Sequence, residues 1–160
     1  MDYMLKSTLK GLCFGLTSGI ITTLGLIVGL NSFAGSKMVL IGGILTIAVA
    51  DSFSDALGIH ISEESEESSH EKVWISTIAT FVSKLIFSST FIIPVLFLEN
   101  SIAIIVSVVW GLLALGVLSY FIAKEQKNNP FKVIGEHLLI AVIVIVLTHY
   151  IGRWIATVFV

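Results

Sequence analysis

Two aspartates and one lysine lie within segments that are otherwise apolar, and their types and spacing are suited to cation chemistry. Asp51 and Asp55 are four residues apart, which places both carboxylates on one face of a helix. Two like charges at this distance repel each other, so they need a cation, a proton or a basic partner to coexist. The pair therefore predicts a cation site. The alternative is a structural pair that Lys84 or neighbouring hydroxyls satisfy.

Lys84 lies near the middle of the apolar segment 73–98, too far from either end to reach water easily. A charged group at membrane depth is costly, so we expect this side chain to face the interior of the bundle. We expect its partner to be Asp51 or Asp55. An ion pair of this kind would lower the net negative charge of the site and weaken the binding of a divalent cation.

The elements that must position these residues are apolar on all sides. Hydrophobic residues make up 56% of the 160-residue chain and charged residues 12%, and the mean hydropathy is +1.00. A hydrocarbon core of about 30 Å takes about 20 helical residues to cross, and backbone groups in lipid must bond within their own segment. The sequence therefore predicts an all-α integral membrane bundle of five transmembrane helices, at residues 11–33, 38–61, 73–98, 102–123 and 133–160.

The lysines outside the predicted spans indicate how the chain is oriented. Six of them fall on one side of the bundle, whereas Lys37 is the one lysine in the opposite connections. The positive-inside rule then predicts a cytoplasmic N-terminus and a C-terminus outside. A compact chain without a targeting segment also predicts a prokaryotic plasma membrane. The six lysines are Lys6, Lys10, Lys72, Lys124, Lys127 and Lys132.

The connection between the second and third predicted spans is strongly acidic. Residues 62–72 form a predicted cytoplasmic loop with five glutamates, and His60 and His70 add imidazole nitrogens to this region. Carboxylate oxygens and imidazoles can gather divalent cations, and Glu63 and Glu66 are best placed because they follow the second span directly. Loops rich in serine and glutamate are more often solvated connectors, and by itself this loop favours that interpretation.

Glycines and hydroxyls recur along the first predicted span. Glycines at intervals of four residues let helices approach closely, so helix packing is the predicted role of this stripe. Ser18 and Thr22 lie on an adjoining ridge. They could line a path for an ion, but hydroxyls in membrane helices often bond only to their own backbone. The glycines are Gly11, Gly15, Gly19, Gly25 and Gly29.

Three stretches, in order along the chain, resemble a known family. Residues 15–29 read Gly-Leu-Thr-Ser-Gly-Ile-Ile-Thr-Thr-Leu-Gly-Leu-Ile-Val-Gly, residues 54–66 read Ser-Asp-Ala-Leu-Gly-Ile-His-Ile-Ser-Glu-Glu-Ser-Glu, and residues 148–153 read Thr-His-Tyr-Ile-Gly-Arg. Together they resemble the first, second and last helices of the vacuolar iron transporter family. The resemblance implies a homodimer of five-helix protomers, with a metal path between the first helices. It also implies export of iron(II), and often manganese(II), from the cytosol in exchange for protons.

The chain departs from this family at positions that matter for metal binding. Ser18 stands where the family has an aspartate in its first helix, and Asp55 stands where the family has a methionine in its second. One carboxylate is lost and another is gained, which gives a site of harder, oxygen-only character. The family's large cytoplasmic insert has no counterpart long enough in this chain. Its short remainder contains Glu63, Glu64, Glu66 and Glu67.

The leading hypothesis is a divalent-metal transporter that exchanges iron(II) or manganese(II) for protons and needs no resident cofactor. Its metal ligands are predicted to be Asp51, Asp55, Glu63 and Glu66, and its transport path to contain Ser18, Thr22, Asp51, Asp55 and Lys84. The alternative is a non-transporting membrane protein of assembly or regulation. We expect no enzyme activity, because an aspartyl protease needs carboxylates that face each other, and no nucleic-acid partner, because a basic patch is missing.

Overall fold

The computed structural model describes residues 2–159, and every regular element in that range is an α-helix. Five stretches are long and apolar enough to cross a membrane, with α3 and α4 together forming one of them. The prediction of an all-α integral membrane bundle with five spans is therefore confirmed. The helices are α1 (Asp2–Phe33), α2 (Lys37–Ser65), α3 (His70–Thr90), α4 (Ile92–Phe97), α5 (Asn100–Glu125) and α6 (Pro130–Val158).

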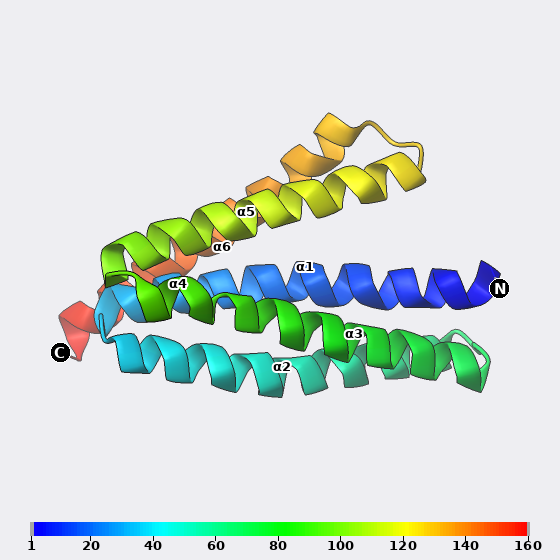
Figure 1. Cartoon of the computed structure of the whole chain (residues 1–160), viewed down its shortest axis with the longest axis horizontal. Coiled ribbons are helices and arrows are strands. Elements are labelled where there is room, and N and C mark those ends of the chain that lie inside the picture. The colour runs from blue at the N-terminus through cyan, green and yellow to red at the C-terminus, as the bar shows by residue number, and fades with distance from the viewer. Residues whose placement is uncertain (1, 160) are drawn as a thin grey trace.

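The spans alternate in direction, so the chain starts and finishes at opposite ends of the bundle (Figure 1). We call the end that holds the start of α1 and the α2–α3 and α5–α6 connections the N-terminal end, and the other the C-terminal end. Helix α1 is central, with α2 and α3 on one side and the α5–α6 hairpin on the other (Figure 1). The hairpin diverges from α1 toward the N-terminal end, so its main contact with α1 lies in the other half.

Helix α1 approaches α3 so closely that only glycine fits at the contact. A Cβ atom on Gly15 would collide with the Thr80 carbonyl oxygen and with Ser83 Oγ, and one on Gly11 with the Ser76 carbonyl oxygen. Gly19 also faces α3, with Ser88 Oγ 3.0 Å from the position of a Cβ. Small residues at this spacing bring two backbones together, and hydroxyl groups on α3 fill the space between them. The predicted packing role of these three glycines is confirmed.

The remaining glycines of α1 lie on another side of the helix, where they pack against α6. Gly25 lies against Val144 and Thr148, and Gly29 lies against Thr148. Gly152 of α6 completes the contact, because a Cβ at this position would collide with the Gly29 carbonyl oxygen. One central helix therefore carries two glycine faces, one for each half of the bundle.

The acidic connection is shorter than the predicted loop 62–72. Residues 62–65 extend α2 and residues 70–72 begin α3, which leaves only 66–69 between the helices. The backbone N–H of Ser68 donates to the Glu63 carbonyl, and Glu67 has a φ of 54°. This is the Schellman arrangement, which closes a helix with one residue in the left-handed region. Backbone bonding at the helix end thus converts most of a predicted loop into helix.

The third span is interrupted, although the sequence predicts one helix over residues 73–98. Helix α3 ends at Thr90 and α4 begins at Ile92. Pro94 explains the break, because it has no N–H for the carbonyl of Thr90 and its ring crowds that carbonyl. In the fifth span, the predicted end at Val160 lies outside the described residues, and α6 ends at Val158.

Candidate functional site

The centre of the polar cluster is Lys84, which is fully buried between three helices. Its Nζ atom lies 2.5 Å from Asp51 Oδ2 and 2.5 Å from Asp55 Oδ2, both on α2. It also donates a hydrogen bond of 2.8 Å to Ser18 Oγ on α1. Two of the three N–H donors of the ammonium group have hydrogen-bond partners, Asp55 Oδ2 and Ser18 Oγ, whereas Asp51 Oδ2 is a buried ion-pair partner without a hydrogen bond. The expected ion pair is present, and it involves both aspartates.

The local sequence explains why these groups meet. The spacing of four residues on α2 turns both carboxylates toward α3, and Ser52 beside them is fully buried. On α1, Gly19 leaves room for the lysine stem, since a Cβ at this position would lie 3.3 Å from Lys84 Cγ. The glycine stripe that lets α1 pack closely on α3 therefore also leaves the space in which the Lys84 side chain extends toward α2.

The cluster carries one formal negative charge, because two carboxylates surround one ammonium. Its lysine side chain is 1% exposed, but those of Asp51 and Asp55 are 26% and 18% exposed. Asp51 reaches a groove of about 580 Å³ between α1 and α2, which also contains Thr46 and Ser54. We call this hollow the α1–α2 groove. The cluster is thus closed on the lysine side and open on the aspartate side.

A divalent cation does not find a ready-made ligand set in the described residues. No group of three or more histidine, cysteine, aspartate or glutamate side chains is gathered there in a metal-binding arrangement. Asp51 and Asp55 are two carboxylates that could contribute to a metal site, but both form ion pairs with Lys84. A metal ion would have to displace the ammonium group before it could bind the two carboxylates.

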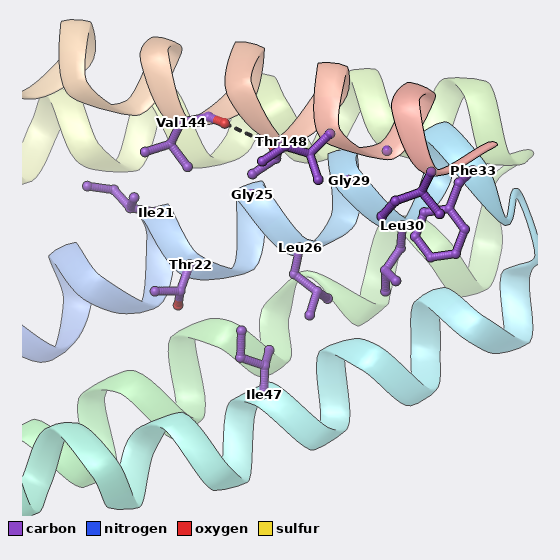
Figure 2. A pocket seen from close by; sticks show the side chains of 13 residues that line it. Ile21, Thr22, Gly25, Leu26, Gly29, Leu30, Phe33, Ile47, Val144 and Thr148 are labelled. Atoms are coloured by element: carbon purple, nitrogen blue, oxygen red, sulfur yellow. Dashed lines mark hydrogen bonds between the residues drawn. The ribbon is translucent and has the colours of Figure 1, made fainter. Parts of the chain in front are cut away.

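Thr22, which the sequence places on the same path as Ser18, does not join the cluster. Its hydroxyl donates to the Ser18 backbone carbonyl at 2.9 Å, as hydroxyls in membrane helices often do. The residue lines an apolar groove of about 560 Å³ between α1 and α6, with Gly25, Gly29 and Thr148 along its wall (Figure 2). We call this hollow the α1–α6 groove.

The two other predicted metal ligands belong to a separate cluster near the N-terminal end. Lys10 Nζ lies 2.6 Å from Glu63 Oε1 and 3.3 Å from Glu66 Oε2, and Ser68 Oγ donates to Glu63 Oε2 at 2.9 Å. Glu63 follows Asp55 by eight residues, which is about 12 Å along a helix. These ion pairs tie α1 to the end of α2. The structure therefore does not bring the four predicted ligands together.

Sequence reasoning missed Lys10 as the partner of Glu63, and it missed the histidine–hydroxyl pairs between helices. One such pair joins His60 on α2 to Thr77 on α3, with Nδ1 and Oγ1 3.0 Å apart. The only available signal was that both residues lie on the inner side of adjoining spans. Partners in different helices cannot be assigned without the rotation of each helix about its axis.

Fold and site together define a class, an integral membrane protein of five spans with a lysine–dicarboxylate cluster inside the bundle. Comparison of the chain with protein-family models, with characterised proteins and with solved structures finds no match. The resemblance to vacuolar iron transporters consequently stays a prediction from the residues that carry it.

Proposed function

We propose that this protein carries divalent cations across the bilayer in exchange for protons. The observation that carries the proposal is the position of the Lys84 ammonium, 2.5 Å from each of two carboxylates within membrane-spanning helices. The ammonium group of Lys84 already occupies the position between Asp51 and Asp55 where a cation would bind. Ionisable groups at this depth are characteristic of ion pathways and proton relays.

Competition for the two carboxylates provides the exchange. With Lys84 protonated, the cluster carries a formal charge of −1, which attracts a cation. Metal ligands must be deprotonated, so a metal ion and protons compete for Asp51 and Asp55. A metal ion bound to the pair would displace the Lys84 ammonium group, and protonation of the pair would release the metal.

We propose iron(II) and manganese(II) as the substrates and export from the cytosol as the direction, following the resemblance in sequence. The open side of the cluster supports a homodimer. Asp51 borders the α1–α2 groove, and a carboxylate that faces lipid is costly unless a protein surface or water covers it. A second copy packed along α1 and α2 would enclose the groove. A prokaryotic plasma membrane is the location we propose.

Flux into liposomes tests the proposal. The purified protein would be reconstituted in liposomes that enclose a metal-quenched dye. Iron(II), manganese(II), cobalt(II), zinc(II) and calcium would be added separately, with and without a proton gradient. We expect flux of a transition metal that depends on the gradient and that the variant Asp51→Asn, Asp55→Asn lacks. Glu136→Gln, which alters an exposed carboxylate on α6, is the matched control and should retain full flux.

The second candidate is a non-transporting protein of assembly or regulation. The observation that favours it is that Lys84 is ion-paired with both carboxylates, and that the described part of the chain holds no group of three or more histidine, cysteine, aspartate or glutamate side chains suited to a metal ion. Under this alternative the ion pair only locks α2 to α3. Absence of flux for every cation, from protein shown to be folded in the liposomes, would favour the second candidate over the first.

A further inference from the structure

A pocket of about 360 Å³ lies between α2 and α3, apart from the lysine cluster and nearer the N-terminal end. Phe53 and Phe81 form its inner part, with ring centroids 4.6 Å apart. His60 and Trp74 form its mouth, with ring centroids 4.9 Å apart in an edge-to-face arrangement. Leu57, which is 59% exposed, is on the outer wall, so the pocket opens sideways from the helix pair. We call it the aromatic pocket.

The position of the aromatic pocket along the helices matches the border between hydrocarbon and headgroups. His60 lies five residues before the end of α2 and Trp74 four residues after the start of α3, so both are within about 8 Å of a helix end. Tryptophan is enriched at this depth of a membrane. Phe53 is about 10 Å deeper, among the acyl chains. The pocket therefore runs from headgroup level into the hydrocarbon.

With His60 neutral, the mouth of the pocket presents two hydrogen-bond acceptors side by side, His60 Nε2 and Glu64 Oε1. Thr77 Oγ1 donates to the Val73 carbonyl at 2.6 Å, so His60 Nδ1 must donate to Thr77 Oγ1. In neutral His60 the other ring nitrogen, Nε2, is then an acceptor. It lies 3.5 Å from Glu64 Oε1, and the Glu64 side chain is 61% exposed. A group with several N–H donors and a positive charge would bond to both atoms at once.

We infer that the aromatic pocket binds one phospholipid with an ethanolamine headgroup, whose primary ammonium group bonds to Glu64 and His60 while one acyl chain lies against Phe53 and Phe81. The ammonium group also lies beside the indole ring of Trp74, where a cation is favoured. A choline headgroup has no N–H donor for the two acceptors. A glycerol headgroup leaves the phosphate charge uncompensated next to the Glu64 carboxylate. The inference does not depend on transport.

Quenching of Trp74 fluorescence tests this inference. In a chain with Trp110→Phe and Trp154→Phe, Trp74 is the sole tryptophan. Phospholipids with brominated acyl chains and ethanolamine, choline or glycerol headgroups would be added in turn to vesicles of unlabelled choline lipid. We expect half-maximal quenching by the ethanolamine lipid at a mole fraction roughly ten-fold lower than for the other two, the effect of one charge-assisted hydrogen bond.

Two glutamate variants test whether the headgroup preference depends on Glu64. Glu64→Gln should remove the preference for ethanolamine, and Glu67→Gln, which changes a carboxylate outside the pocket, should keep it. Equal quenching by all three lipids, a preference for glycerol, or a preference that survives Glu64→Gln would overturn the inference. If the tryptophan variants do not fold, native mass spectrometry of the unaltered chain takes their place. It should show one retained ethanolamine lipid, and retention of none, or of the other lipids equally, would overturn the inference.

Discussion

The two halves of the bundle, α1–α2–α3 and the α5–α6 hairpin, are both apolar but are held by different means. In the first half, α1 meets α3 through a stripe of glycines and hydroxyls, and buried Lys84 joins three helices. The hairpin has few such contacts. In the described part of α6 only Ala141 and Gly152 are buried, and the helix meets α1 mainly at Gly25 and Gly29.

This difference shows that apolar composition does not determine packing inside a membrane. A leucine gains little by leaving lipid for a protein interior, so close contact depends on small residues and polar groups. The half in which these residues line the whole contact with α1 is compact, and the half that meets α1 through fewer of them diverges toward the N-terminal end (Figure 1). The hairpin provides span length and an apolar surface, whereas the first half contains the buried cluster of Lys84, Asp51 and Asp55.

The largest expected effect comes from removing the charge that joins the first half. Lys84→Met leaves Asp51 and Asp55 without a partner in a partly buried site within the membrane spans, so we expect a loss of up to about 3 kcal/mol in the free energy of unfolding. Unfolding in mixed micelles would measure it. Adding Asp51→Asn and Asp55→Asn should recover most of this loss. Lys132→Met, at an exposed position of the hairpin, should change stability by no more than about 0.5 kcal/mol.

The glycine contact between α1 and α3 should be the next most sensitive. Gly15→Ala places a methyl group against the Thr80 carbonyl and Ser83 Oγ, and the resulting overpacking should cost about 1–3 kcal/mol. Gly58→Ala is the matched control, because no atom lies within 4 Å of the added Cβ, and alanine is the better helix former. Equal stabilities of the two variants would contradict the close approach of α1 and α3.

The corresponding change in the hairpin should loosen it and leave the first half intact. Gly152→Ala collides with the Gly29 carbonyl, so we expect a smaller loss of about 1 kcal/mol and a freer α5–α6 hairpin. Cys13, the only cysteine, lies on α1 in a hollow that the end of α5 also lines, and its rate of maleimide labelling can report the movement. The rate should rise for Gly152→Ala and stay unchanged for Gly135→Ala, whose added Cβ meets open space.

The smallest effect concerns the connection between α5 and α6. Lys127 has a φ of 57°, a left-handed conformation that is unfavourable for residues with a side chain. Lys127→Gly should raise the free energy of unfolding by up to about 1 kcal/mol. The preceding residue, Gln126, has a φ of −79°, so Gln126→Gly should lower stability instead. The same sign for both variants, in thermal unfolding, would argue against this assignment of the helix end.

Much of this arrangement could be predicted from the sequence, for reasons that particular residues make clear. The spans follow from length and hydropathy, since each apolar segment must bond its own backbone groups in lipid. Lys84 had to be buried and paired, because a charge at that depth has no other stable position. The break before Pro94 and the helical ends of the acidic connection were missed, because they depend on local backbone bonds that hydropathy does not reflect.

The sequence by itself therefore determined the number of spans, the shared face of Asp51 and Asp55 and the need for a buried partner. Only the tertiary structure decided which groups meet. It places Ser18 Oγ within hydrogen-bond distance of Lys84 and leaves Thr22 outside this cluster, and it pairs Glu63 with Lys10, apart from Asp51 and Asp55. The physical reason is that these contacts join different helices. They depend on the rotation and depth of each helix, which close packing at the glycines fixes and hydropathy does not.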